Sequence, residues 1–118
     1  MWLITESGFG SVVAHREKED VLLVRARSRD DLEAFCRIAA EEGIEGFDPG
    51  GIWEDPSADY RWRMEVGQAA VADLARVLVE RIDYDNFKSR VGRDDPGREM
   101  IYHGVWRELL NIEQSGRG

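Results

Sequence analysis

Two carboxylates and a histidine are the residues of this chain with the plainest potential for chemistry. Asp83 and Asp85 flank a tyrosine in "DYDN", and His103 lies further along the chain. If they converged, these groups could bind a divalent metal or activate water, as in a hydrolase or nuclease. The spacing from Asp83 is similar to the start of a calcium-binding loop, but Phe87 occupies a ligand position and the loop glycine is missing. We therefore favour capping, by Asp83 or Asp85, of a short helical turn that begins near Asn86.

The other candidates for catalysis lack a partner at the required spacing. Glu99 and Arg107 lie four residues before and after His103, so ion pairing on one helix surface explains all three. His15 is distant in sequence and no H-E-x-x-H motif is present, so the sequence predicts no metal site and no cofactor. Cys36 falls on the apolar stripe of a predicted helix, where buried packing is favoured over nucleophilic work.

Four arginines give the most specific prediction of a binding site. In "VRAR" and "YRWR" the arginines alternate with apolar or aromatic residues, and alternate residues of a strand point to opposite faces of a sheet. If these segments are neighbouring strands, one face carries four guanidinium groups that suit carboxylates and phosphates, with Tyr60 available for stacking. This face would bind an anionic small molecule or a nucleotide. The arginines are Arg25, Arg27, Arg61 and Arg63.

Neutralisation of these arginines by acidic residues is the alternative, and the composition favours it. The chain has 24 acidic residues, and several could fold over the guanidinium groups: Glu6, Glu17, Glu65 and the acids of residues 43–59. An unpaired cluster of four arginines costs stability. Val21 and Leu23 share the same predicted face, which also allows the sheet to pack against a second copy of the chain.

The elements that must position these residues begin with three short extended segments. Residues 2–5, 8–16 and 21–27 predict a three-stranded meander separated by turn residues. Ser28 then caps a helix, with Asp31 in the position of the capping-box acid. An apolar stripe at helical spacing follows, and Gly43 is the expected carboxyl-terminal cap. The stripe comprises Leu32, Phe35, Cys36 and Ala39.

A long acidic loop over residues 43–59 precedes a further strand over residues 60–66. In that strand one face is apolar and is expected to lie under the helices, as are Leu22, Val24 and Ala26. Its members are Tyr60, Trp62, Met64 and Val66. A second helix follows Gly67. After the turn near Asn86, which Gly92 should end, Asp95 and Pro96 start a last helix with a wide apolar face.

The order of elements predicts an α+β domain, with two to three helices on one face of a mostly antiparallel sheet, broadly like a ferredoxin-like sandwich. A length of 118 residues fits one domain, which we place at residues 1–114 with a flexible tail at 115–118. The net charge of −8 opposes general nucleic-acid binding or attachment to an anionic membrane. One cysteine and no long apolar segment indicate a cytoplasmic protein.

Several stretches resemble a group of small bacterial proteins that have no established activity. They are "MWLIT…GFGSVV", "LLVRARSRDDLEAF", "DYRWR", "IDYDNFKSRV" and "YHGVWREL". The resemblance implies a folded bacterial domain and departs from the pattern at the long loop over residues 43–59.

The sequence thus favours a non-enzymatic binding or regulatory protein whose partner is another protein or a second copy of itself. No recognised catalytic constellation is present, and aromatic residues such as Trp2, Phe47 and Trp53 lie in segments too short to bury them all. The alternatives are the anion binder with the arginine face, and a hydrolase or nuclease that uses Asp83, Asp85 and His103.

Overall fold

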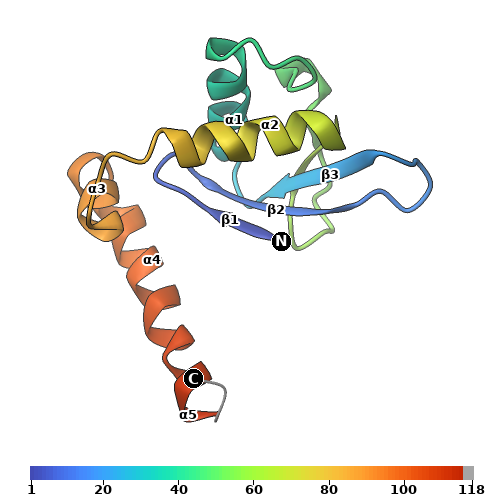
Figure 1. Cartoon of the computed structure of the whole chain (residues 1–118). Helices are drawn as coiled ribbons and strands as arrows, with labels where there is room; N and C mark the ends of the chain where they lie inside the picture. The colour runs from blue at the N-terminus through green and yellow to red at the C-terminus, as the bar shows by residue number, and fades with distance from the viewer. Residues whose placement is uncertain (116–118) are drawn as a thin grey trace. The chain divides into compact units, whose positions relative to one another are not determined.

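Five antiparallel strands form one sheet in the computed structural model, which describes residues 1–115 (Figure 1). The strand order is β1-β2-β3-β5-β4, so the predicted meander is continued by the last two strands. The strands are β1 (Trp2–Ile4), β2 (Phe9–Ala14), β3 (Val21–Ala26), β4 (Trp53–Glu54) and β5 (Trp62–Gly67). The predicted α+β class with an antiparallel sheet is confirmed. The fold is similar to a ferredoxin-like sandwich only in its layers, with helices packed on one face of a sheet. The order of elements differs, because a ferredoxin-like fold runs β-α-β-β-α-β whereas three strands precede the first helix here.

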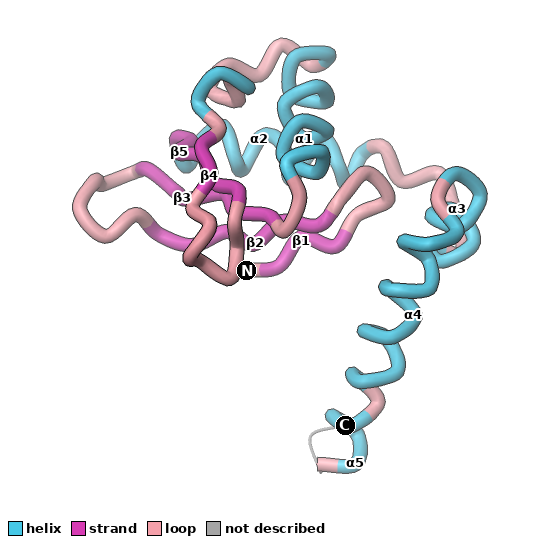
Figure 2. The backbone as a smooth tube through the Cα atoms, turned by 180° about the vertical axis from the view of Figure 1, so that it is seen from behind, coloured by secondary structure: helices cyan, strands magenta, loops and turns pink. Residues whose placement is uncertain are grey.

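Two helices cover one face of this sheet, as Figures 1 and 2 show from opposite sides. They are α1 (Arg29–Glu41) and α2 (Gln68–Glu80). Ser28 caps α1 as predicted, since its side chain accepts a hydrogen bond from the Asp31 N–H. Gly43 follows the end of α1 with a φ of +69°, the left-handed conformation expected of a glycine there.

The core lies between the helices and the sheet. Cross-strand pairing places Val24 opposite Met64 and Leu22 opposite Val66, so the predicted apolar faces of β3 and β5 do meet. The long loop contributes as well, because Phe47 and Ile52 are buried in this core beside the short 3₁₀ helix Pro49–Gly51. The helices supply Leu32, Phe35, Cys36, Ile38, Ala39, Val71, Leu74 and Val77.

The chain divides into two compact units. We call Met1–Ile82 the sheet unit and the residues from Asp83 onward the helical unit. The helical unit contains α3 (Phe87–Asp94), α4 (Pro96–Leu109) and the short α5 (Asn111–Gln114). A single domain over residues 1–114 stays a prediction. Of the predicted tail, Ser115 follows α5, and residues 116–118 lie outside the described residues.

Two details of the sequence prediction for the helical unit are corrected. Asn86, and not Asp83 or Asp85, caps α3, because its side-chain oxygen accepts the Ser89 N–H at 2.9 Å. Gly92 does not end this helix, which continues to Asp94.

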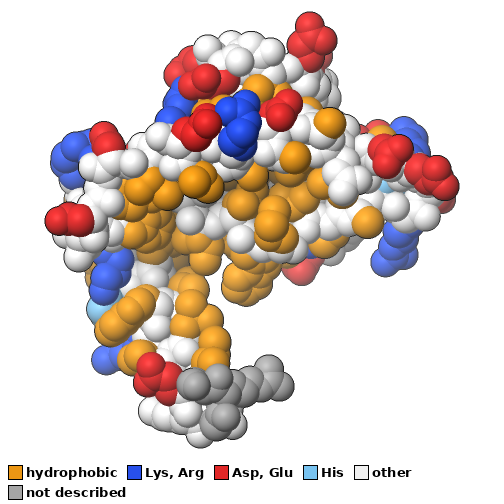
Figure 3. Space-filling model, in the orientation of Figure 1, with side chains coloured by type: hydrophobic (Ala, Val, Ile, Leu, Met, Phe, Trp, Pro, Cys, Tyr) orange, Lys and Arg blue, Asp and Glu red, His pale blue; other side chains and the backbone are white. Residues whose placement is uncertain are grey.

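Most of the apolar side chains of the last helix do not enter a core. Asp95 and Pro96 start α4 as predicted. Tyr102 is buried and stacks on Phe87 of α3, with ring centroids 5.7 Å apart. Six large apolar residues of this region are instead exposed, which a periodic pattern alone could not reveal. They are Met100, Ile101, Trp106, Leu109, Leu110 and Ile112 (Figure 3).

Candidate functional site

One row of side chains crosses the whole sheet on the face away from α1 and α2. The registers pair Trp2 with Ser11, Ser11 with Arg25, Arg25 with Arg63, and Arg63 with Trp53. Directly paired residues project from the same face of a sheet, so these five side chains lie in one line from β1 to β4. We call them the transverse row. It has a tryptophan at each end and two arginines in its middle.

The two ends of the row are exposed and its interior is held in place. Trp2 is 60% exposed and Trp53 is 41% exposed, whereas Ser11 is buried. The Arg25 side chain is half-buried, and its Nη2 donates a hydrogen bond of 2.7 Å to the Ser11 hydroxyl. The Nε of Arg25 is buried and has no hydrogen-bond partner among the described residues. The middle of the row therefore presents an ordered guanidinium group.

Tyr60 lies beside the row and not under the helices, which corrects the predicted orientation. Strand β5 begins at Trp62, two residues later than Tyr60, so the alternation that holds for Trp62 does not extend to Tyr60. The guanidinium carbons of Arg25 and Arg27 lie 4.7 and 4.9 Å from the centre of the Tyr60 ring. The Tyr60 ring also lies near the Phe9 ring, with the two ring centroids 6.3 Å apart.

The four predicted arginines differ in their compensation by acidic residues. Arg61 precedes β5 and pairs with Glu54 at 2.7 Å. Arg63 forms no ion pair in the described part of the chain, although its charge is a minor cause of the lowered pKa of Asp55, after the hydrogen bonds from Ser57. Arg25 and Arg27 likewise lack a carboxylate partner among residues 1–115. Neutralisation thus applies to Arg61 and only weakly to Arg63.

Glu65, which we expected over the arginines, is engaged elsewhere. Its carboxylate contacts the Lys18 ammonium at 3.0 Å and His15 Nε2 at 2.7 Å, at the β2–β3 turn. His15 Nδ1 accepts the backbone N–H groups of Glu17 and Lys18, so Nε2 is the nitrogen that donates to Glu65. His15 therefore orders a turn.

This contact gives a pH-dependent prediction. Hydrogen bonds from Lys18 and then His15 hold the pKa of the Glu65 carboxyl below its ordinary value. Because folding lowers this pKa, the stability that Glu65 contributes is present above the pKa of the unfolded chain and is lost as pH falls through the folded value. Glu65→Gln should therefore lower the melting temperature at about pH 7 and lower it less at about pH 3. Calorimetry at both pH values measures this, and an equal loss at both would refute the assignment.

Among the described residues, the acidic candidates of the helical unit and His103 have different neighbours. Asp83 forms an ion pair of 2.6 Å with Arg90, and Asp83 and Asp85 line an open depression of about 680 Å³. His103 does not line it; instead its ring stacks on Trp106, and its Nδ1 lies 3.4 Å from the Lys88 ammonium. Within residues 1–115 no group of three His, Cys, Asp or Glu side chains is placed to hold a metal ion.

Cys36 is buried in the core, as the apolar stripe predicts. Burial, with smaller contributions from Asp48 and Glu33, raises the pKa of its thiol to about 11. The folded protein should therefore fail to react with a thiol reagent such as DTNB at about pH 8, and should react fully in urea. The absorbance of the thiolate that DTNB releases measures the reaction. Rapid reaction of the folded protein would contradict the burial of Cys36.

Sequence reasoning missed Trp2, Ser11 and Trp53 as members of one site. The available signal was the alternation within each strand, which identified Arg25 and Arg63. Membership of the row depends on register, and the register of β4 against β5 follows from a loop whose course the sequence does not specify.

No family model, curated protein or solved structure matches the chain. The resemblance to small bacterial proteins stays a prediction. In the part of the chain that the structure describes, none of the helices combines the length and the apolar character that a bilayer crossing requires.

Proposed function

We propose that this protein is a non-enzymatic binding protein, and that the transverse row takes an extended segment of a partner protein. The observation that carries the proposal is the row itself, with exposed tryptophans at both ends and arginines between them. Tryptophan, tyrosine and arginine are the residue types that most often supply the energy of protein–protein binding. The row itself supplies tryptophan and arginine, and the buried Tyr60 supports it from beneath Arg25 and Arg27.

The length of the row favours a polypeptide over a small ligand. Neighbouring strands are about 4.8 Å apart, so the four intervals from β1 to β4 span roughly 19 Å. An extended peptide of about six residues covers this distance. A nucleotide, the alternative anionic ligand, would cover only part of the row and would leave one tryptophan without a contact.

Selection from a phage-displayed library of random peptides tests the proposal. The protein is immobilised through its carboxyl terminus, and selected peptides are remeasured in solution. Replacing Trp2 and Trp53 together with alanine is expected to weaken binding by at least about tenfold, since each loses a large aromatic contact. Trp106→Ala is the matched control, because Trp106 is similarly exposed but belongs to the helical unit. No selected peptide, or equal sensitivity to the control, would refute the proposal.

Self-association through the helical unit is a second candidate function. Among residues 1–115, eleven large hydrophobic residues are exposed, and six of them lie in the segment from Met100 to Ile112. Exposed apolar area of this density is typical of an interaction surface. Sedimentation velocity over a concentration series should show a dimer that Ile101→Lys with Leu109→Lys converts to a monomer. A wild-type chain that stays monomeric throughout would remove this candidate.

A further inference from the structure

We propose that the middle of the transverse row is a carboxylate-binding site, so that the partner segment is acidic. This inference rests on the proposed function and specifies the chemistry of its ligand. It concerns Arg25 and Arg63, which are directly paired across β3 and β5, together with Ser11 and Tyr60.

The pairing of two arginines is unfavourable unless an anion lies near them. Like charges directly opposite each other destabilise a sheet. The chain carries 24 acidic residues, and Arg29, Arg61 and Arg76 each form an ion pair of 2.7 Å with one of them. Neither Arg25 nor Arg63 has such a partner among residues 1–115. An external anion would supply the missing charge.

The Arg25 guanidinium is already fixed for this task. Its Nη2 is held by the buried Ser11 hydroxyl at 2.7 Å, and its guanidinium carbon lies over the Tyr60 ring, 4.7 Å from the ring centroid. A side chain that is ordered before binding loses less conformational entropy when the ligand arrives. Guanidinium groups bind carboxylates through two parallel hydrogen bonds, which fits a Glu or Asp side chain placed over the row.

The surroundings favour an acidic peptide over a nucleic acid. The net charge of −8 repels a polyanion, and the repulsion grows with the number of phosphates. A peptide needs carboxylates only over the two arginines, and it can place apolar side chains against Trp2 and Trp53. Single-stranded nucleic acid also stacks on tryptophan, so the experiment includes it as a competitor.

Two capped peptides that differ only in charge test the inference. The probes are LSESESL and LSQSQSL, each long enough to cross the row. Because alternate side chains of an extended peptide share a face, each probe can place two Leu over the tryptophans and two Glu or two Gln over the arginines. Binding is followed by tryptophan fluorescence. The acidic peptide should bind at least about tenfold more tightly than its neutral counterpart, because only carboxylates can pair with the guanidinium groups. The preference should disappear in the Arg25→Gln, Arg63→Gln double variant. Arg76→Gln, on the exposed side of α2, is the matched control and should keep it.

Each other outcome has a defined meaning. The single variant Arg63→Gln should show a smaller loss of the preference for the acidic peptide. It keeps Arg25, so it tests the inference even if the change at Arg25 disrupts the fold. Circular dichroism confirms that each variant is folded. If library peptides bind at the row without a preference for acidic residues, this inference fails while the proposed function stands. If a dodecamer of thymidine binds through the same arginines and the acidic peptide does not, the acidic-peptide assignment is overturned.

Discussion

Replacing Phe35 with alanine is expected to lower the free energy of unfolding by about 4 kcal/mol. Phe35 is fully buried on α1, and its ring lies against Gly10 of β2, where a Cβ atom would come within 2.9 Å of the ring. The substitution leaves a cavity between helix and sheet that the close-packed strand cannot fill. Urea denaturation followed by circular dichroism measures the loss.

Val79→Ala is the control for this prediction. Val79 lies on α2 in the same sheet unit but is 66% exposed, so the same measurement should show a change below about 0.5 kcal/mol. Similar losses at Phe35 and Val79 would contradict the placement of the core between α1 and the sheet.

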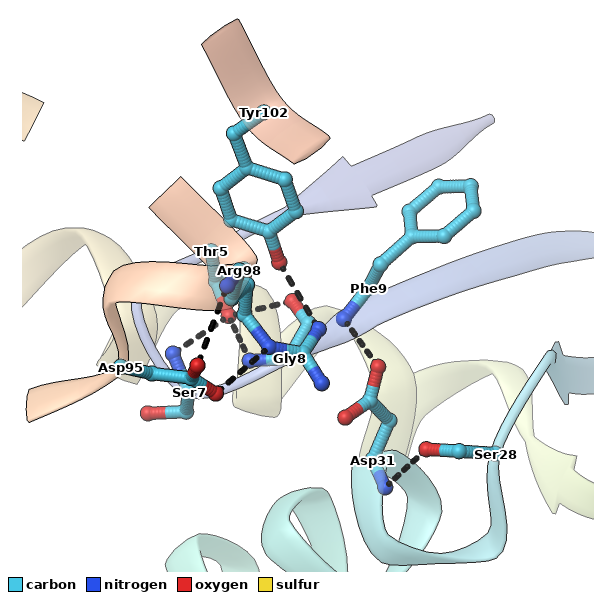
Figure 4. Close-up of polar contacts among 9 residues, drawn as sticks. All are labelled: Thr5, Ser7, Gly8, Phe9, Ser28, Asp31, Asp95, Arg98 and Tyr102. Atoms are coloured by element: carbon cyan, nitrogen blue, oxygen red, sulfur yellow. Dashed lines mark hydrogen bonds and ion pairs between the residues drawn. The ribbon is translucent and has the colours of Figure 1, made fainter. Parts of the chain in front are cut away.

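Removing the Asp31 carboxylate should cost about 2 kcal/mol of stability. Asp31 is buried at the start of α1, and its Oδ2 accepts the Phe9 N–H of β2 at 2.9 Å (Figure 4). Gly8 makes room for this contact, because a Cβ atom there would lie 3.0 Å from the carboxylate carbon. Asp31→Ala leaves a strand N–H without its acceptor and also removes a favourable charge from the first turn of the helix.

Asp30→Ala separates these two effects. Asp30 is also in the first turn of α1 but is exposed, so its loss removes only the interaction with the helix dipole, about 0.5 kcal/mol. Chemical denaturation of both variants at neutral pH gives the comparison. Equal losses would show that the contact with Phe9 contributes nothing, and the account of how α1 is fixed to the meander would be wrong.

Local patterns in the sequence predicted the sheet unit well. Alternation identified Met64 and Val66 as core residues, and the Ser28 cap identified the start of α1, because these features depend on neighbours in the chain. The predicted orientation of Tyr60 was wrong because strand β5 begins at Trp62, after this residue. The transverse row needed the pairing of distant segments, above all Arg63 with Trp53.

In the helical unit, local patterns predicted burial that the structure does not show. The apolar residues of α4 were expected to contribute a wide buried face, yet Met100 is 77% exposed and Ile101 is 68% exposed. Periodicity reports which side chains favour burial and does not report whether the chain itself supplies the covering surface. Only a structure distinguishes an internal core from an exposed apolar surface.

The indole N–H signals of the four tryptophans test most directly whether the transverse row binds a partner segment, as we propose. In ¹H–¹⁵N spectra, adding a selected peptide should shift the signals of Trp2 and Trp53, at the ends of the row. Trp106 of the helical unit should stay unchanged. A shift of Trp106 with Trp2 and Trp53 unmoved would contradict the account.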